Sequence, residues 1–334
     1  MRILIRTDMG KHHGMGHAVR MLALARQLAA AGAEVSFVTR TPELQGYVAP
    51  FRCYMPDETA PTTRGDVLVI DTKAADWAND DSALYLARDT GMQIVRIDHP
   101  QATPDSCDLL IGPCAHWHEA TVARLQRSFG DRFLYGWNYV MLDPRVTELP
   151  PVPRTGSRVR PIVFTAGGSD PTGALQRMYD LSATCQTTGP LVFLVGAQAP
   201  MVKTLPRHNR GSTFLVTSFT RHWIQHAGVV VTLFGVTCYE ALWWQVPQLI
   251  FSTTQEHHTD ALWFEHVVHG CVADEMACGS AVFAGAFEAF TAEDFCLELQ
   301  EMCMYANEVS GYSTVEGFDG LGLQRITQAI LALA

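Results

Sequence analysis

Short apolar runs alternate with amphipathic segments along the whole chain. Five runs in the first half have the length of buried strands, at residues 2–6, 34–38, 67–71, 93–98 and 108–112. Between the first two, apolar residues recur at helical spacing from Ala18 to Leu28, and Gly32 ends the pattern. The first half is therefore predicted to alternate strands with helices.

The second half repeats this alternation. Its expected strands are 161–168, 190–196, 213–219, 228–233 and 247–251, with helices at 237–245 and 259–268. A proline-rich polar segment, 149–161, is predicted to link the halves. Strands separated by helices form parallel sheets. We therefore expect an α/β protein of two Rossmann-like domains, 1–150 and 151–334, facing each other across a cleft, with ligands at the carboxyl ends of the strands.

Composition narrows the class of protein. The 334 residues are 48% hydrophobic, enough for two cores. No apolar run approaches the roughly 20 residues of a membrane span, and the first residues lack signal-peptide features. We therefore expect a cytoplasmic protein. The nine cysteines are scattered, odd in number and without a CxxC pair, which argues against a disulfide framework or structural zinc site and predicts small buried thiols.

The formal net charge of −10 is concentrated near the C-terminus. From Cys271 onward there are ten acidic residues, and Arg325 is the single cation. Such a segment repels a phosphate backbone, which argues against extended nucleic-acid binding.

The stretch DMGKHHGMGHAVR, residues 8–20, follows the first expected strand. Gly14 and Gly16 would let a ligand approach the backbone, and His17 opens the helix. A neutral imidazole there is suited to act as a general base; the alternative is a structural or capping histidine. The full GxGxxG fingerprint is missing and the second strand ends in Arg40, which argues against a nicotinamide cofactor.

Two further motifs follow strands in the second half. In TAGGSDPTG (165–173), Gly167 and Gly168 allow close approach, and Ser169 or Asp170 could cap a helix; a plain connection is the alternative. In the stretch 233–251, Gly235 precedes a helix whose N-terminus is suited to a diphosphate. The predicted nucleotide-binding residues are Gly167, Gly168, Ser169, Phe214, Gly235, Val236, Thr237, Glu240 and Glu256, with Glu256 placed for ribose hydroxyls. Viewed alone, glutamates such as Glu240 and Glu256 are more often solvated carboxylates than ligands.

The order of these motifs resembles the glycosyltransferase-B superfamily. More closely, it resembles the nucleotide-sugar hydrolase of pseudaminic acid biosynthesis, which cleaves UDP from a diacetamido-trideoxy sugar, and its spore-coat-polysaccharide relatives. The first motif matches at Arg6, Asp8, Gly14, Gly16, His17 and Arg20. Similar segments follow at 107–113, 136–144, 165–173 and 255–264, so the likeness covers roughly residues 1–275.

The resemblance implies roles for individual residues. The family's motif histidine is its catalytic base, which makes His17 the first candidate and Asp8 the second. The C-terminal domain would hold UDP. The predicted substrate-binding residues are Gly14, Gly16, Arg20, Asp71, Lys73, Asn138, Tyr139, His257 and His258.

Three departures from the family pattern concern sugar recognition. The family has a tyrosine two residues after an aspartate, where this chain reads Asp71-Thr72-Lys73. Its Glu-Asn-Gln segment corresponds to Glu256-His257-His258 here, and one of its basic residues corresponds to Asp143. The glycine turns remain. This pattern is typical of shared donor chemistry with a different sugar or acceptor.

We therefore expect metal-independent chemistry without a cofactor, on a nucleotide sugar that the resemblance makes UDP-linked. No DxD pair lies in a suitable loop, and Asp80-Asp81 is expected on the surface. Transfer to an unknown acceptor (saccharide, protein or modified base) is the first expectation and hydrolysis the second. A nucleotide-sugar 2-epimerase and a non-catalytic nucleotide-sugar-binding protein follow.

Two aromatic clusters lie outside these motifs. Trp117 lies between His116 and His118 and could stack on a sugar, but packing within the domain is the favoured interpretation. Of Trp243 and Trp244, at least one is expected in the core.

Overall fold

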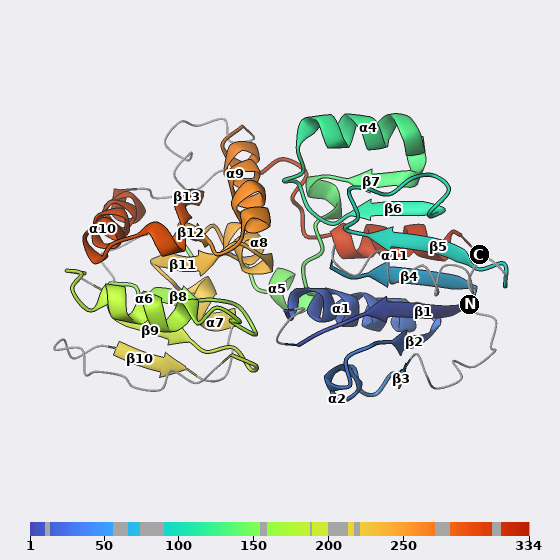
Figure 1. Cartoon of the computed structure of the whole chain (residues 1–334), viewed down its shortest axis with the longest axis horizontal. Coiled ribbons are helices and arrows are strands. Elements are labelled where there is room, and N and C mark those ends of the chain that lie inside the picture. The colour runs from blue at the N-terminus through green and yellow to red at the C-terminus, as the bar shows by residue number, and fades with distance from the viewer. Residues whose placement is uncertain are drawn as a thin grey trace. The chain divides into compact units, whose positions relative to one another are not determined.

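The computed structural model describes residues 1–10, 14–55, 66–73, 90–153, 159–187, 189–199, 213–216, 221–270, 281–308 and 315–333. The chain divides into two compact units (Figure 1). Unit 1 comprises Met1–Pro144 and Gly317–Ala334, and unit 2 comprises Arg145–Glu316. None of the helices in the described ranges is both long and apolar enough to cross a bilayer.

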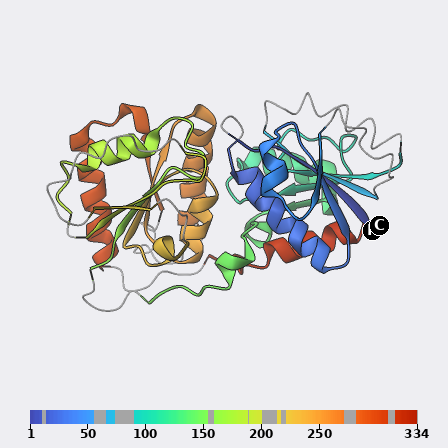
Figure 2. The ribbon, with the colours of Figure 1, turned by 90° about the horizontal axis from the view of Figure 1, so that it is seen from below.

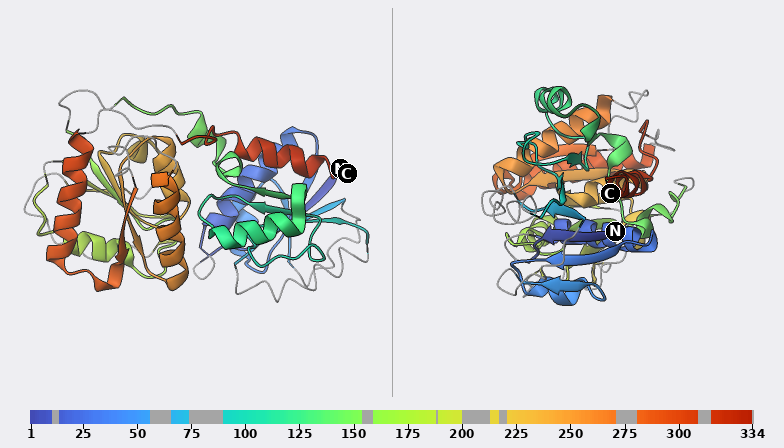
Figure 3. Two further views of the ribbon diagram at one scale, coloured as in Figure 1. Left: turned by 90° about the horizontal axis from the view of Figure 1, so that it is seen from above. Right: turned by 90° about the vertical axis from the view of Figure 1, so that its right-hand side faces the viewer.

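Unit 1 contains a seven-stranded parallel sheet in the order β3-β2-β1-β4-β5-β6-β7. Its strands are β1 (Arg2–Thr7), β2 (Glu34–Val38), β3 (Arg52–Tyr54), β4 (Val67–Asp71), β5 (Gln93–Ile97), β6 (Leu109–Gly112) and β7 (Phe133–Tyr135). Its helical segments are α1 (Gly16–Ala30), α2 (Glu43–Tyr47), α4 (Glu119–Phe129), η2 (Gly130–Arg132), η3 (Trp137–Tyr139) and α11 (Gly322–Leu331). Helices α1 and α11 cover one face of the sheet, and α4 covers the other (Figure 3).

Unit 2 repeats this architecture with a six-stranded parallel sheet in the order β10-β9-β8-β11-β12-β13. Its strands are β8 (Ile162–Thr165), β9 (Leu191–Leu194), β10 (Thr213–Val216), β11 (Val229–Leu233), β12 (Gln248–Ser252) and β13 (Ala281–Ala286). Its helical segments are α6 (Ala174–Ser182), α7 (Arg221–Gln225), α8 (Val236–Trp243), α9 (Gln255–Gly270), η5 (Phe287–Ala289) and α10 (Ala292–Glu308). The helices lie on both faces of the sheet (Figure 2). The predicted pair of Rossmann-like domains is confirmed.

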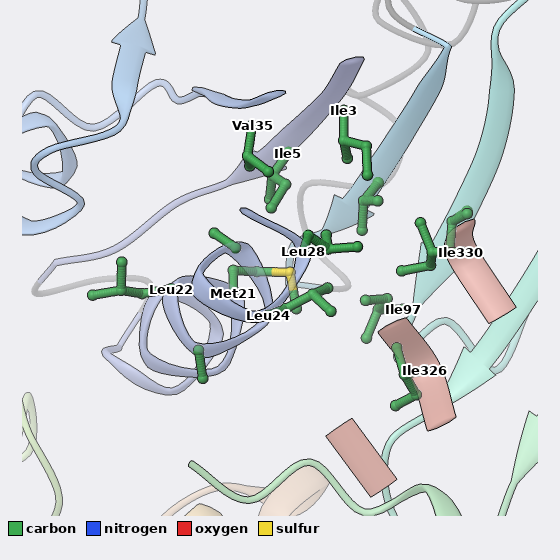
Figure 4. Close-up of a cluster of buried hydrophobic side chains, with 14 of the residues drawn as sticks. Ile3, Ile5, Met21, Leu22, Leu24, Leu28, Val35, Ile97, Ile326 and Ile330 are labelled. Atoms are coloured by element: carbon green, nitrogen blue, oxygen red, sulfur yellow. The ribbon is translucent and has the colours of Figure 1, made fainter. Parts of the chain in front are cut away.

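The C-terminal segment differs from its predicted place in the second domain. Residues 317–334 belong to unit 1, because the apolar face of α11 packs on α1. Leu323, Ile326 and Ile330 are at most 2% exposed and lie in the same cluster as Leu24 (Figure 4). Burying each such side chain stabilises unit 1 by about 1.5–3 kcal/mol. The sequence alone does not show which of the two cores this helix covers.

The boundary between the units also precedes the predicted linker. Helix α5 (Pro144–Thr147) spans it, and the residues after α5 are bonded to unit 2. The Leu149 carbonyl accepts a hydrogen bond from Trp244 Nε1 at 3.0 Å. The Pro150 carbonyl accepts one from Gln225 Nε2 at 2.7 Å. Because these side chains hold it, the start of the proline-rich segment is part of unit 2.

A disulfide between Cys185 and Cys296 connects the loop after α6 to α10, with a Cα–Cα distance of 5.0 Å. The expectation that the cysteines form no disulfides was therefore wrong for this pair. The two residues are 111 positions apart, so no local spacing reveals them. Among the free cysteines of the described chain, Cys107, Cys114 and Cys238 are buried, as predicted.

Candidate functional site

The loop between β1 and α1 is closed by its own backbone. Gly14 N donates to the Gly10 carbonyl at 2.8 Å, and Gly10 N donates back to the Gly14 carbonyl at 3.1 Å. Both glycines have positive φ, 120° and 77°, which side chains with a Cβ rarely adopt. A Cβ on Gly14 would meet nothing within 4 Å. Backbone conformation therefore requires glycine here, and the closed loop fixes where α1 begins.

His17, the second residue of α1, is held by a buried carboxylate. Its Nδ1 lies 2.7 Å from Oδ1 of Asp71, which ends β4 beside Thr7 of β1. Burial alone would raise the pKa of Asp71, but the charge of Arg20 and the interaction with His17 outweigh it and hold the pKa at about 2. The carboxylate is therefore ionised and can only accept hydrogen bonds.

The ionised carboxylate favours the tautomer of neutral His17 that carries its proton on Nδ1 and leaves a lone pair on Nε2. No hydrogen-bond partner of Nε2 occurs among the described residues, and the His17 side chain is 17% exposed. This arrangement of carboxylate, imidazole and exposed ring nitrogen is chemically suited to accept a proton.

Arg20 lies one helical turn after His17 and binds two carboxylates. Its Nε donates to Asp71 Oδ2 at 2.7 Å, and its Nη2 donates to Asp71 Oδ1 at 2.6 Å. Nη2 also donates to Oδ2 of Asp98, directly after β5, at 2.8 Å. Although burial would lower the pKa of Arg20, the two carboxylates raise it. The predicted substrate ligand Arg20 is thus bound within the protein.

Asp8, the second predicted catalytic residue, belongs to a separate buried network. Its carboxylate accepts hydrogen bonds from Arg6 Nη2 (2.6 Å), Thr39 Oγ1 (3.0 Å) and Arg40 N (2.7 Å). Burial would raise the pKa of Asp8, but Arg6 and the other donors lower it. With its side chain 2% exposed, Asp8 joins the ends of β1 and β2.

The other predicted substrate residues of unit 1 are dispersed. Lys73 is exposed two residues after Asp71. Asn138 and Tyr139 lie in η3 against α11, where Arg325 Nη1 donates to the Asn138 carbonyl at 3.1 Å.

In unit 2, the glycine loop after β8 packs against the loop after β9. Gly167 has φ 81°, and Gln198 N donates to the Gly168 carbonyl at 2.9 Å. A Cβ on Gly196 would overlap the carbonyl oxygens of Gly167 and Gly168. Gly196 was missed by the sequence analysis. Its place at the carboxyl end of an apolar run is the signal that could have found it.

Of the two candidate capping residues, Ser169 and Asp170, it is Asp170 that caps α6. Its carboxylate accepts from Ala174 N at 2.8 Å and Leu175 N at 3.1 Å. The chain's own carboxylate therefore occupies the N-terminus of α6. Burial raises the pKa of Asp170 despite these hydrogen bonds.

The N-terminus of α8 has no such cap. Gly235 precedes it in an extended conformation and has no side chain to cap it, and among the described residues no side chain accepts a hydrogen bond from the N–H groups of Val236 and Thr237. Glu240, later in α8, is 5% exposed, with Oε1 3.7 Å from Arg221 Nε. An uncapped helix N-terminus is suited to an anion.

The first turn of α9 carries the remaining predicted residues. Glu256 is exposed. The backbone N–H of His257 donates to Thr254 Oγ1 at 3.1 Å. His258 Nδ1 lies 3.3 Å from Ser252 Oγ, with its ring edge-on to Phe283. The side chain of Phe214, in β10, lies outside the described residues.

The aromatic predictions favoured packing, and packing is what is observed. Trp117 is 7% exposed, stacks on Phe133 and Tyr135, and donates its backbone N–H to the Tyr135 hydroxyl at 2.8 Å. Trp244 is 1% exposed. Asp80-Asp81 lies outside the described ranges, and no group of three metal-ligating side chains occurs within them.

No family model and no curated protein matches the sequence. Solved structures match over nearly the whole chain. The glycotransferase of kitacinnamycin is 13% identical, covering 99% of this chain and 98% of that chain, with a TM-score of 0.67. A putative UDP-N-acetylglucosamine 2-epimerase from Listeria monocytogenes is 12% identical, covering 99% and 96%, with a TM-score of 0.63.

Arabidopsis thaliana UGT89C1, complexed with UDP, is 12% identical, covering 98% of this chain and 99% of that chain, with a TM-score of 0.62. The chain has the glycosyltransferase-B fold. At these identities the likeness establishes the fold alone, and the narrower resemblance to the pseudaminic-acid enzyme stays a prediction.

Proposed function

We propose that this protein is a glycosyltransferase that uses a nucleotide sugar, UDP-linked, as donor. The observation that carries the proposal is the His17–Asp71 pair, which leaves Nε2 of His17 free to accept a proton. Solved structures of the same fold include one complexed with UDP and one bound to UDP-GlcNAc, which supports a UDP-linked donor.

The proposed reaction uses His17 as the general base. The acceptor hydroxyl gives its proton to Nε2 while its oxygen forms a bond to the anomeric carbon of the sugar. The bond from that carbon to the diphosphate oxygen breaks, and its electron pair leaves with UDP. Asp71 holds Nδ1–H and stabilises the imidazolium that forms. Asp8 orders the backbone near this site in the proposal and takes no proton.

Unit 2 supplies the proposed nucleotide site. The uncapped first turn of α8, at Val236 and Thr237, and Gly168 of the glycine loop offer backbone N–H groups, whereas the N–H of Gly167 is donated to Thr165 Oγ1. Such donors stabilise the charge that develops on a leaving diphosphate. The reaction needs no metal in this scheme. Glu256, exposed on α9, is proposed to bind the ribose.

A second candidate is a nucleotide-sugar 2-epimerase, because UDP-GlcNAc 2-epimerases are among the solved structures of this fold. One experiment separates the possibilities. The protein is incubated with a panel of nucleotide sugars, with and without candidate acceptors, and nucleotide release is followed by mass spectrometry. Release that requires an acceptor supports transfer.

The other outcomes contradict the transferase. Release without an acceptor identifies a hydrolase. Conversion of the donor to an isomer, detected by NMR, identifies an epimerase. If no nucleotide is released and no donor is converted, the protein only binds nucleotide sugars.

A further inference from the structure

Asp98 accepts a hydrogen bond from Nη2 of Arg20, the same nitrogen that lies next to both His17 and Asp71. The Nη2 atom of Arg20 lies 2.6 Å from Asp71 Oδ1, 2.8 Å from Asp98 Oδ2 and 3.1 Å from His17 Nδ1. Three chain segments that are distant in sequence thus meet at one atom. Asp98 has no role in the function described so far.

We propose that Asp98 is a positioning residue that fixes the tautomer of His17 through Arg20. This inference rests on the proposed function for its role in turnover, but its structural part can be measured independently. The Nη2 atom of Arg20 carries two hydrogens. One is donated to Asp71 and the other to Asp98.

Without an acceptor at position 98, the second hydrogen of Nη2 has Nδ1 of His17 as its nearest alternative acceptor. A hydrogen bond from Arg20 to Nδ1 requires a lone pair there, which places the imidazole proton on Nε2. That tautomer cannot accept a proton from a substrate hydroxyl. Asp98 prevents this hydrogen bond from Arg20 to His17 because its carboxylate accepts the second hydrogen of Nη2.

The charge balance supports the same assignment. With His17 neutral, the carboxylates of Asp71 and Asp98 and the guanidinium of Arg20 carry one net negative charge. When His17 takes a proton, the cluster becomes neutral. Asp98 thus supplies the charge that balances the imidazolium, and it does so at a site where the Asp71 side chain is fully buried and the Arg20 side chain is 13% exposed.

The backbone at Asp98 is also specialised. Its φ is 59°, in the left-handed region that few residues other than glycine, asparagine and aspartate adopt. Its N–H donates to the Ile111 carbonyl at 2.8 Å, which anchors the turn after β5. Backbone strain of this kind is concentrated at functional sites. The conformation also identifies substitutions that the backbone tolerates.

Two variants separate the hydrogen bond from the charge. Asp98→Gly suits the positive φ and removes the acceptor. Asp98→Asn also suits it, keeps an acceptor oxygen and removes the charge. Asp105, exposed in a turn of unit 1, provides the matched controls Asp105→Gly and Asp105→Asn.

The experiment is ¹⁵N NMR of the imidazole nitrogens at neutral pH, with the His17 signals assigned by their loss in His17→Gln. In the unsubstituted protein, Nδ1 of His17 should have the shift of a protonated nitrogen and Nε2 that of an unprotonated one. Asp98→Gly should move both shifts toward the opposite tautomer, Asp98→Asn should move them less, and the Asp105 variants should leave them unchanged. Unchanged His17 shifts in a folded Asp98→Gly protein would overturn the proposal.

Turnover provides the second readout. For Asp98→Gly we expect kcat to fall about tenfold to a hundredfold, within the range that general-base catalysis contributes, with KM for the nucleotide sugar within about twofold. A fall in turnover without a change in the ¹⁵N shifts would show that Asp98 acts on substrate directly and would overturn the positioning role. If the shifts move as expected but the unsubstituted protein turns over no nucleotide sugar, the proposed function fails and the assignment of Asp98 to the His17 tautomer stands.

Discussion

His17 Nδ1 and Asp71 Oδ1 are 2.7 Å apart, although the two residues are separated by 54 positions in the chain. The contact exists because β1 and β4 are neighbouring parallel strands whose carboxyl ends lie side by side. One strand leads into the helix that carries the imidazole, and the other ends in the carboxylate.

Replacing His17 by glutamine should remove the base and preserve the fold. We expect kcat to fall by about 10²- to 10⁴-fold, while binding of UDP, measured by calorimetry, stays within about twofold. The matched control is His266→Gln, at an exposed position of α9, which should leave both quantities unchanged. Full turnover in the His17 variant would move the base elsewhere.

Replacing Asp71 by asparagine should lower kcat to a similar extent, because an amide cannot select the Nδ1–H tautomer as a carboxylate does. It also leaves the Arg20 charge with Asp98 as its one remaining carboxylate. Steady-state kinetics should show the loss in kcat with little change in KM. An Asp71→Asn enzyme with ordinary kcat would show that the pair has no catalytic role.

The stability of unit 1 should depend on pH through Asp71. The folded-state pKa of about 2 lies below the ordinary 3.8, so the ionised carboxylate contributes stability above pH 3.8, and this contribution is lost as the pH falls toward 2. The shift corresponds to ~2 kcal/mol. Urea unfolding at several pH values should show the difference between the unsubstituted protein and Asp71→Asn shrinking as the pH falls through this window. A constant difference would contradict the assignment.

Replacing Gly196 by alanine should weaken nucleotide binding. The new Cβ would overlap the carbonyl oxygens of Gly167 and Gly168, so the glycine loop must shift. We expect Kd for UDP to rise at least tenfold and the free energy of unfolding to fall by about 1–3 kcal/mol, as for other overpacked sites. Gly46→Ala is the matched control, because its Cβ meets nothing within 4 Å and its φ is not positive. Equal affinities in the two variants would show that the glycine loop does not bind nucleotide.

The disulfide between Cys185 and Cys296 should stabilise unit 2. Because it closes a loop of 111 positions, removing it should lower the free energy of unfolding by about 2–5 kcal/mol. Dithiothreitol should lower the stability of the unsubstituted protein by the same amount and leave the double variant Cys185→Ser, Cys296→Ser unaffected. Identical unfolding with and without reductant would show that the bond does not form in solution.

The sequence predicted all the inner strands of both sheets, and also the edge strand β10. In VLVID, every residue of β4 is buried, because both faces of a parallel sheet are covered, and this produces an uninterrupted apolar run. Strands β3 and β7 have three residues each and are partly exposed. Their hydrophobic patterns are too short to distinguish them from loops, so the sequence could not reveal these two strands.

The site was predictable in its parts but not in its contacts. His17 was predicted from the glycine turn and its helix, whereas Asp71 and Arg20 were assigned to substrate instead of to each other. Pairing across 51 positions is set by strand order, which local spacing does not encode. The sequence analysis did not single out Asp98. Asp98 directly follows an apolar strand, as Asp71 ends one, and this position at the carboxyl end of a strand is the signal that could have identified it.

Because α11 completes the core of unit 1, this unit is discontinuous in sequence, and unit 2 is inserted within it. During synthesis, the strands of unit 1 cannot acquire their full core until α11 has also left the ribosome. Unit 2, whose residues are contiguous, can fold in the meantime. A circular permutant that joined the present termini and opened the chain near Pro144 would make unit 1 contiguous and should let it fold without waiting for the rest.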